Sequence, residues 1–459
     1  MTTDTRQQAI EYAHQNSARF LSDLNQLLTI ASVSTSPEHK PEMQRAADWL
    51  AAAMRKIGLE NVQILPTAGH PVVYADWLHA GPDRKTVLIY GHYDVQPAEP
   101  LEKWLSGAFE PEVRGDNLFA RGASDMKGQV LASLAAVESV LKQGALPINV
   151  KFIVEGEEEI GSPNLSPFLE AYRSLLASDV ALNPDAGMIA PDIPTIVYGL
   201  RGLVYFELHV TGPEHDLHSG LFGGVVHNPA QVLCELIAGM HDAQGRVTLA
   251  GYYDRVRPLS QQEREELARL PMDEAYYRQT AGLSETWGEA GYTPAERVGA
   301  RPTLEVNGML AGFTGAGAKT VIPATAMAKI SMRLVPDQDP DEVHQQLLAY
   351  LQAKAPSSVQ WELIKFKGSA PASMSDPNLP ATLALGRALE MVWGIRPVLK
   401  REGGSVPVVG DMQRILGIDS VLTGFGLPDD NLHAPNEKLH LPTWYRGIDT
   451  LIHFLYNYT

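Results

Sequence analysis

The first part of the chain alternates short apolar runs with longer segments whose apolar residues recur at helical spacing. Residues 86–90 (TVLIY) and 149–154 (NVKFIV) have the pattern of buried strands. Residues 41–57 and 128–142 have the pattern of helices, and Gly58 is expected to end the first of them. This alternation of strands and helices favours a layered α/β sheet.

The pattern changes near residue 200. Strands are expected at residues 203–211, 326–335 and 359–366, and helices at 230–240 and 340–354. This order predicts a small α+β unit of its own. The pattern does not determine the role of residues 250–300, which are charged and helix-prone.

Residues 379–393 are then expected to form a helix and residues 418–423 a short strand. Their apolar pattern is similar to that of the first part of the chain. We therefore expect a discontinuous main domain formed by residues 1–201 and 374–459. The smaller domain, residues 202–373, interrupts it. A chain of 459 residues is long enough for two such cores.

Composition narrows the possible partners. With 37 basic and 54 acidic residues the net charge is −17, which argues against nucleic acid as a partner. No apolar run approaches the ~18 residues of a membrane span, so no membrane partner is expected. The N-terminal residues do not have the pattern of a secretory signal, and Cys234 alone cannot form an intrachain disulfide. A cytoplasmic protein acting on small molecules or proteins is the expectation.

Coordinating side chains gather where predicted strands or glycine-bearing turns end. They are His92 and Asp94 in GHYDVQP, Asp125 in RGASDMKG, Glu157, Glu158 and Glu159 in EGEEEIGS, and His433 in GFGLPDDNLHAPNE. Ligands of open α/β sheets bind in the crevice beyond the carboxyl ends of the strands. The four segments can therefore converge on one site.

Each segment also has an ordinary structural interpretation. A histidine is more often a surface or core residue than a ligand, Asp125 could cap a helix, the glutamates could form a solvated turn, and Asp94 could cap a turn. Taken together, however, the acids would repel one another unless a cation lay among them. Two divalent ions balance such a cluster. Nitrogen and oxygen ligands without thiolate suit zinc, with manganese or cobalt as alternatives, and a pair of ions that activates water implies hydrolysis.

Eight motifs in a fixed order now connect the chain to a family. They are GHYDVQP, GASDMKG, EGEEEIGS, DLHSG, GAKTVIP, RLVP, REGGS and LHAPNEK. From about residue 20 to the C-terminus the chain closely resembles the co-catalytic zinc peptidases, which include carnosinase-type dipeptidases, glutamate carboxypeptidases, aminoacylases, acetylornithine deacetylase and succinyl-diaminopimelate desuccinylase. The resemblance implies an α/β/α catalytic domain interrupted by a smaller ferredoxin-like α+β domain, which serves as lid and dimerisation domain.

The resemblance also implies the ligands of the two metal ions. Carried over residue by residue, they are His92 and Asp185 for one ion, Glu159 and His433 for the other, and Asp125 as the bridge. Asp185 lies in ALNPDAG, which is not a strong motif, and is chosen by its 13-residue distance to Tyr198 in YGLRG. Asp179 and Asp192 remain alternatives to it.

Two further residues are expected beside the ligands. Glu158 resembles the family's general base, which takes a proton from the attacking water and passes it to the leaving amine. Asp94 resembles the acid that orients His92 through its second ring nitrogen. In the family, the peptide bond after the bridging aspartate, here Asp125–Met126, is typically cis.

The substrate contacts follow from the same resemblance. His218 in DLHSG resembles a histidine that reaches into the partner subunit's active site to stabilise the oxyanion, which implies a homodimer. Thr320 and Arg333 match positions that hold the substrate carboxylate, and an arginine fork suits that group. Glu402 and Ser405 in REGGS resemble the dipeptidase branch, in which the glutamate meets a free α-amine.

These features predict a metal-dependent dipeptidase acting on small peptides. A second possibility is an N-acyl-amino-acid deacylase or a carboxypeptidase of the same family. The substrates of the deacylases have no free α-amine that Glu402 could bind. A third is a non-catalytic binding protein. It would be expected to lack a ligand or the base, and the sequence retains all of them.

Overall fold

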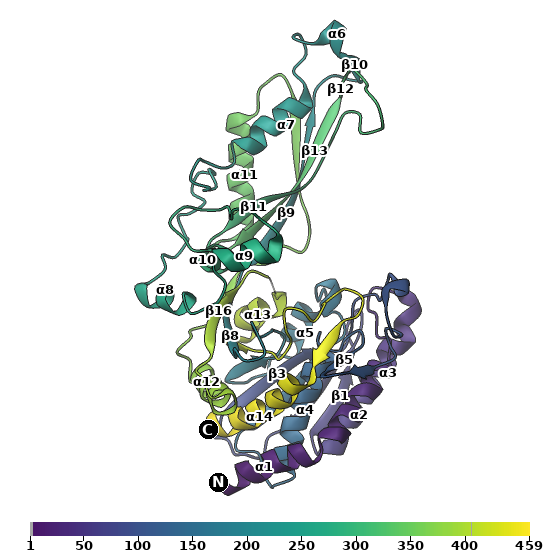
Figure 1. Ribbon diagram of the computed structural model, residues 1–459, viewed down its shortest axis with the longest axis vertical. Helices are drawn as coiled ribbons and strands as arrows, with labels where there is room; N and C mark the ends of the chain where they lie inside the picture. Colours follow the sequence, from purple (N-terminus) through teal and green to yellow (C-terminus); the bar gives the residue numbers. More distant parts are fainter. Residues whose placement is uncertain (1–2, 405) are drawn as a thin grey trace. The chain divides into compact units, whose positions relative to one another are not determined.

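The computed structural model describes residues 3–404 and 406–459 and divides into two compact units (Figure 1). Unit 1 comprises Met1–Tyr198, Ser375–Lys400 and Pro407–Thr459, and unit 2 comprises Gly199–Met374 and Arg401–Val406. These bounds lie close to those expected from the sequence. The segment Arg401–Val406 differs, because it was expected in the main domain and belongs to unit 2. Ser405, an expected substrate contact, lies outside the described residues.

Unit 1 is built on a mixed sheet in the order β1-β2-β6-β3-β7-β17-β8. Its strands are β1 (Glu60–Leu65), β2 (Val72–Trp77), β3 (Thr86–His92), β6 (Asn149–Glu155), β7 (Val180–Asn183), β8 (Thr195–Leu200) and β17 (Ser420–Leu422). The central strands β6, β3, β7 and β17 are parallel to one another. The middle of the sheet is buried, which explains why these strands read as continuous apolar runs.

Helices pack around this sheet. They are α1 (Thr3–Gln15), α2 (Ser17–Leu28), α3 (Lys40–Ile57), α4 (Lys127–Leu141), α5 (Leu165–Ala171), α12 (Pro380–Trp393), α13 (Pro407–Asp411) and α14 (Leu441–Asn457). Helix α4 is buried along almost its whole length because it contacts β3, α1, α2, α3 and α14. Gly91 permits this close packing, since a Cβ there would lie 2.6 Å from Val130 Cγ2. Gly58 ends α3 with a φ of 106°, as predicted.

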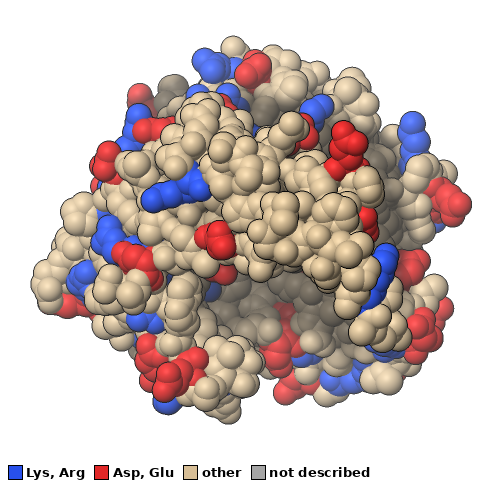
Figure 2. Space-filling view, turned by 90° about the horizontal axis from the view of Figure 1, so that it is seen from above, with Lys and Arg blue, Asp and Glu red and all other residues tan. Residues whose placement is uncertain are grey.

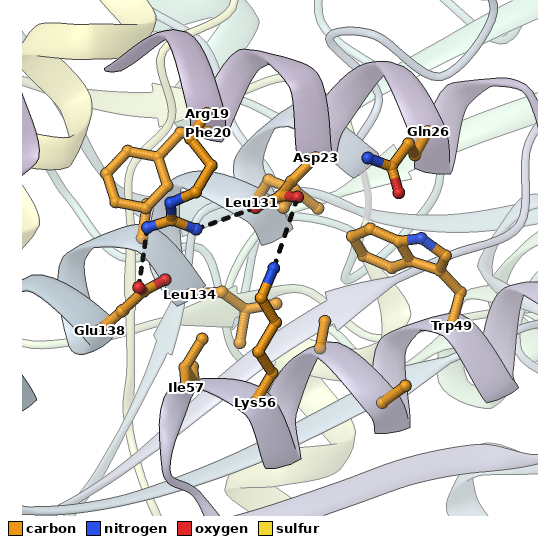
Figure 3. A pocket seen from close by; sticks show the side chains of 13 residues that line it. Arg19, Phe20, Asp23, Gln26, Trp49, Lys56, Ile57, Leu131, Leu134 and Glu138 are labelled. Atoms are coloured by element: carbon orange, nitrogen blue, oxygen red, sulfur yellow. Dashed lines mark hydrogen bonds and ion pairs between the residues drawn. The ribbon is translucent and has the colours of Figure 1, made fainter. Parts of the chain in front are cut away.

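A cavity of about 190 Å³ lies among α2, α3 and α4 (Figure 3). Its charged side chains pair with one another: Arg19 with Glu138 at 2.7 Å and with Asp23 at 3.0 Å, and Lys56 with Asp23 at 3.9 Å. Apolar side chains such as Leu131 cover the rest of the wall. Because the charges are mutually satisfied, this cavity offers no specific chemistry to a ligand.

A small antiparallel sheet completes unit 1. Its strands are β4 (Glu112–Arg114), β5 (Asn117–Phe119) and β18 (Lys438–His440), in the order β18-β5-β4. It joins the segment before α4 to the segment after His433. The two segments that carry Asp125 and His433 are thereby tied together.

Unit 2 contains a four-stranded antiparallel sheet in the order β11-β13-β9-β14. Its main elements in chain order are β9 (Gly202–Thr211), α7 (Pro229–Ala238), β11 (Thr303–Ala311), β13 (Thr325–Leu334), α11 (Pro340–Lys354) and β14 (Gln360–Lys365). This βαββαβ order is that of a ferredoxin-like unit. The expected fold class is confirmed for both units.

The two faces of this sheet differ. Alternate residues of β9 and β13 are buried, and α7 and α11 pack on the face that they form. The core includes Val204, Phe206, Leu208, Val210, Ala328, Ile330 and Met332. The opposite face is polar, with Glu207, His209, Ser331 and Arg333 only partly buried.

Short elements complete unit 2. They are β10 (Leu217–His218), α6 (Ser219–Phe222), β12 (Val321–Ile322), α8 (Gln261–Leu267), α9 (Glu274–Ala281) and α10 (Pro294–Ala300). Within unit 2, β10, α6 and β12 lie at one end of the long strand β13 (Figure 1). Across residues 3–404 and 406–459, no helix has both the length and the apolar character needed to cross a membrane.

Candidate metal centre

Three of the segments that carry expected site residues follow the carboxyl ends of strands on the same side of the sheet of unit 1. β3 ends at His92, which pairs in register with Glu155, the last residue of the parallel strand β6. β7 runs parallel to β3 and ends at Asn183, two residues before Asp185. The carboxyl ends of parallel strands lie together, so the sheet itself brings these segments to one crevice.

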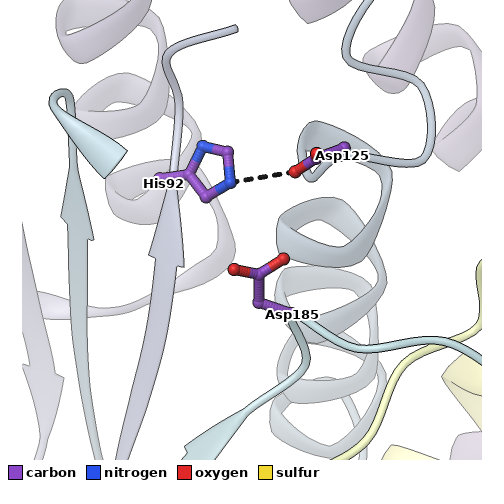
Figure 4. Close-up of side chains that lie close together, drawn as sticks. All are labelled: His92, Asp125 and Asp185. Carbon is purple, nitrogen blue, oxygen red and sulfur yellow. Dashed lines mark hydrogen bonds and ion pairs between the residues drawn. The ribbon is translucent and has the colours of Figure 1, made fainter. Parts of the chain in front are cut away.

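The first group of possible ligands consists of His92, Asp125 and Asp185, whose side chains point toward one another (Figure 4). Their ligand atoms all lie within 4.8 Å of one another. His92 Nε2 is 3.1 Å from Asp125 Oδ1. The backbone N–H of Asp185 donates to Asn183 Oδ1 at 2.9 Å, which fixes the turn after β7.

The second group consists of Asp125, Glu159 and His433. His433 Nε2 lies 3.0 Å from Asp125 Oδ2 and 3.3 Å from Glu159 Oε2. Asp125 belongs to both groups and turns one carboxylate oxygen toward each. A carboxylate placed in this way could bridge two ions, with one oxygen for each group.

Of the three aspartates considered as a ligand of the first ion, the structure places Asp185, but not Asp179 or Asp192, in a group of possible ligands. Asp179 precedes β7, where its carboxylate accepts from Lys85 Nζ and from the backbone N–H of Thr86, both at 2.8 Å. Asp179 therefore lies at the amino end of β7, on the side of the sheet opposite to the ligand groups. Among the described residues, Asp192 takes part in neither ligand group.

Asp94 contacts both His92 and the glutamate segment. His92 Nδ1 is 3.0 Å from the backbone oxygen of Asp94 and 3.4 Å from its Oδ1. The carboxylate of Asp94 also accepts the backbone N–H groups of Glu158 and Glu159, at 3.2 and 3.1 Å. The sequence predicted only the contact with His92. Asp94 thus positions the two neighbouring glutamates as well.

Glu437 is a residue of the site that the sequence analysis did not single out. Its carboxylate accepts the backbone N–H groups of Gly122, Ser124 and Asp125 at 2.9, 3.0 and 3.1 Å. It also pairs with Arg121 at 2.8 Å, and both side chains are buried. Glu437 therefore holds the backbone that presents Asp125. Its place in LHAPNEK, four residues after His433, was the available signal.

Gln96 was also missed. Its Nε2 donates to Glu159 Oε2 at 2.9 Å and to the backbone oxygen of Glu159 at 3.2 Å. It lies in the motif GHYDVQP, in which the sequence analysis assigned roles to His92 and Asp94 alone. The peptide bond Asp125–Met126 is cis, as the resemblance implied.

The carboxylates of the site attract positive charge. Hydrogen bonds to Asp125 and Glu159 raise the pKa of His433 to about 10. Burial alone would lower the pKa of His92, but its hydrogen bonds to Asp125 and Asp94 raise that pKa well above the usual value. Burial, together with the nearby Asp125, Glu159 and Asp94, raises the pKa of Glu158 to about 7. A site of this kind is stabilised by cations.

The donor set fits divalent metal ions. It comprises three carboxylates and two imidazoles, without a thiolate. Oxygen and nitrogen donors of this kind suit zinc, and also manganese or cobalt. We therefore find that the residues present can hold two ions, one in each group.

Those expected substrate contacts that the structure describes belong to unit 2 and occupy two places in it. His218 pairs with Val321 across β10 and β12, and Ser219 N–H donates to the backbone oxygen of Thr320 at 3.1 Å. His218 and Thr320 are thus neighbours, and both are exposed. Arg333 pairs with Leu203 near the other end of β13.

Glu402 lies near Arg333. It ends β16 (Val398–Glu402), and its backbone oxygen accepts from Arg201 N–H at 3.2 Å. The charges of both Arg333 and Glu402 act on the Arg201 guanidinium. Arg333 and Glu402 therefore form one neighbourhood, and His218 and Thr320 form another.

Known proteins with similar sequences include metal-dependent peptidases, in agreement with the two groups of possible metal ligands. Residues 88–457 match the model of "Peptidase family M20/M25/M40". The Cys-Gly metallodipeptidase of Candida albicans is 31% identical over 461 residues, covering 96% of this chain and 94% of the relative. The human Beta-Ala-His dipeptidase is 31% identical over 464 residues, covering 96% and 90%.

A solved structure is similar over nearly the same span. The M20 family metallo-carboxypeptidase Sso-CP2 from Sulfolobus solfataricus has a TM-score of 0.82 and 34% identity, covering 96% of this chain and 99% of its own. The family match covers most of the chain, including His92, Asp125, Glu159 and His433. From its sequence and its fold alike, the chain belongs to peptidase family M20/M25/M40.

Proposed function

We propose that the protein is a dipeptidase that uses two divalent metal ions, zinc before manganese or cobalt, to hydrolyse unmodified dipeptides. The observation that carries the proposal is Asp125, which is shared by two ligand groups next to Glu158. The relatives named as metallodipeptidase and as Beta-Ala-His dipeptidase support the same reaction.

Glu158 is the general base in this proposal. Metal ions in such a site polarise the scissile carbonyl and activate water. Glu158 takes the proton of the attacking water and returns it to the leaving amine. Its backbone is held by Asp94, so the base and the ligand Glu159 keep a fixed relation.

The neighbourhood of Arg333 and Glu402 supplies opposite charges for the two ends of a dipeptide. Arg333 binds the substrate carboxylate, which a guanidinium fork matches well. Glu402 binds the free α-amine, and Ser405 assists it. An N-acylated amino acid has no α-amine to offer Glu402, so this pair favours dipeptides over acylated substrates.

We place His218 and Thr320 in the active site of the partner subunit of a homodimer. The spacing within unit 2 supports this placement. Thr325 and Arg333 are eight residues apart on β13, which at about 3.3 Å per residue separates the two ends by about 26 Å. An extended dipeptide spans about 7 Å. This separation supports assigning His218 and Arg333 of one chain to two different dipeptides, as a homodimer would allow.

Exposed apolar side chains of unit 2 support the same dimer. Leu221 and Val225 are 76% and 82% exposed, and Met309 and Leu310, on the edge strand β11, are 50% and 57% exposed. An open strand edge with apolar residues is a surface that proteins normally cover.

A cytoplasmic location stays a prediction from composition.

A deacylase or a carboxypeptidase is the second candidate, and the similarity to a metallo-carboxypeptidase favours keeping it. A panel of L-Ala-L-Ala, N-acetyl-L-alanine, N-succinyl-L-alanine and benzyloxycarbonyl-Gly-L-Ala separates the candidates. We expect kcat/KM for the free dipeptide to exceed the other three by about 100-fold, the size of a lost charged contact. Higher kcat/KM for any blocked substrate would replace the dipeptidase assignment.

A further inference from the structure

The loop from Leu427 to Lys438 carries His433, a possible ligand of the second group, and has an unusual backbone. Asn431, His433 and Asn436 have positive φ angles of 55°, 60° and 61°. Residues other than glycine seldom adopt this left-handed conformation, and a chain keeps it only where the surrounding contacts determine it. Contacts with the rest of the protein must therefore hold this loop in its shape.

The side chain of His433 is half exposed. It has 54% of its surface open to solvent, and its Nε2 faces Asp125 and Glu159, the other two members of its group. Exposed side chains change rotamer rapidly, because little packing restricts them. The place of this imidazole in the site is therefore set mainly by the backbone of the loop.

Asp430 closes the loop. Its Oδ2 accepts the backbone N–H of Leu427 at 2.8 Å, and its Oδ1 accepts from Lys438 Nζ at 3.1 Å. The backbone of Asp430 joins the same two residues, since its N–H donates to Leu427 O at 3.0 Å and its oxygen accepts the N–H of Lys438 at 2.9 Å. One residue thus holds both ends of the loop.

Asp430 also connects the loop to the segment that carries Asp125. Ser124, which directly precedes Asp125, donates through Oγ to Asp430 Oδ2 at 2.8 Å. The two segments approach closely, because a Cβ on Gly426 would lie 2.5 Å from Ser124 Oγ. Asp430 therefore fixes the loop of His433 relative to the carboxylate that the two ligand groups share.

The burial of Asp430 suits it to this task. On the face of the protein shown in Figure 2, acidic side chains lie exposed among basic ones. Asp430 differs from these because it is completely buried. A buried carboxylate is costly unless hydrogen bonds and an opposite charge compensate it. Its removal would leave buried partners unpaired, so the loop would have to rearrange.

We propose that Asp430 is a positioning residue for the second metal ion, which closes the loop 427–438 and holds His433 beside Asp125 and Glu159 before the ion binds. It rests on the proposed function, in which these three residues bind that ion. Residues that orient a metal ligand commonly strengthen metal binding without touching the ion themselves.

Glu437 has a different task from Asp430. It holds the backbone that presents Asp125, the carboxylate shared by both groups. Asp430 acts on His433, which belongs to the second group and not to the first. Replacing Asp430 is therefore expected to weaken the binding of one ion, whereas replacing Glu437 is expected to weaken the binding of both.

Zinc binding to the wild type and to Asp430→Asn, measured by competition with a chromophoric chelator, tests this without any turnover. The amide has one acceptor oxygen in place of two, so it cannot keep all the hydrogen bonds of the carboxylate. The variant should bind one ion as the wild type does and the other about 10- to 100-fold more weakly. Glu437→Gln should weaken both.

Two results would overturn the inference and leave the dipeptidase function standing. They are unchanged affinity of Asp430→Asn for both ions, and an equal loss for both. A wild-type protein that binds fewer than two ions would contradict the proposed function, and the inference with it.

A double variant shows whether Asp430 acts through His433. His433→Ala removes the ligand itself and should weaken the second ion. If Asp430 only positions this histidine, adding Asp430→Asn to His433→Ala should change the affinity no further. A general structural effect would instead lower it by the same factor in both backgrounds, which would overturn the inference.

Asp429→Asn is the matched control. Asp429 is the neighbouring residue and lies 3.1 Å from the same Lys438 Nζ, but its side chain is 75% exposed. Its replacement removes the same charge without opening the loop, so both ions should bind with wild-type affinity. An equal loss in Asp429→Asn and Asp430→Asn would show that charge near Lys438, and not the closure of the loop, governs the second ion.

Hydrogen exchange in the wild-type protein decides the matter if Asp430→Asn does not fold. The backbone N–H groups of Leu427 and Lys438 both donate to Asp430. Both amides should exchange slowly in the metal-free protein, and zinc should change their rates little. Protection that arises only after zinc is added would show that the ion orders the loop, and would overturn the inference.

Discussion

Replacing Glu158 by glutamine is expected to lower kcat for dipeptide hydrolysis by about 10²- to 10⁴-fold, the usual contribution of a general base. The amide keeps the size of the side chain but cannot accept the proton of the attacking water. The ligands His92, Asp125, Glu159, Asp185 and His433 are untouched. Metal content, measured by elemental analysis, should therefore stay at the wild-type value.

Glu157→Gln is the control for this variant. Glu157 is the preceding acid in the same motif, but its carboxylate accepts from the backbone N–H of His70 and from Asn164 Nδ2, at 3.1 and 2.8 Å. It should change kcat far less than Glu158→Gln does. Near wild-type turnover by Glu158→Gln would show that another group is the base.

Replacing His218 by alanine is expected to lower kcat by about 10²- to 10³-fold, the usual cost of removing a group that stabilises the oxyanion. His218 is exposed, and among the described residues its Nδ1 accepts only a local hydrogen bond, from Gly220 N–H at 3.0 Å. The fold and the metal content should therefore be preserved. Circular dichroism and elemental analysis verify both.

Mixing two inactive variants distinguishes action in the partner subunit from action in the same chain. In a purified heterodimer of His218→Ala and Glu158→Gln, one of the two sites combines an intact Glu158 with the partner's intact histidine. About half the wild-type activity should return. If His218 served its own chain, both sites would be defective, so an inactive heterodimer would contradict the dimer proposal.

Several elements around the site were predictable from their apolar patterns, but β7, which precedes Asp185, was not predicted. The apolar run at residues 86–90 predicted β3, and the helical spacing at 128–142 predicted α4. β3 extends further than predicted, through His92, because His92 still pairs with Glu155 of β6. A polar residue at a strand end breaks the apolar pattern although the backbone ladder continues.

Other features leave no local trace in the sequence. β11 was not predicted because it is an edge strand with mostly exposed residues, so it lacks an apolar alternation. The contacts of Glu437 join backbone groups more than 300 residues away, and no period reports such a contact.

The site residues were recognisable because several weak signals coincided. His92 alone, or Asp125 alone, would have been an ordinary core residue or helix cap. Their positions after strand ends predicted convergence, and the order of the motifs gave each a candidate role. The structure brings the expected ligands into two groups that share Asp125.

Reactivation of the metal-free protein tests the central claim most directly. The protein is stripped with a chelator, and hydrolysis of L-Ala-L-Ala is followed while zinc or manganese is added back. The account predicts no hydrolysis without metal and a rate that stops rising at two ions per chain, as expected for a paired-metal site. Full hydrolysis by the metal-free protein, or a rate that stops rising at one ion per chain, would contradict it.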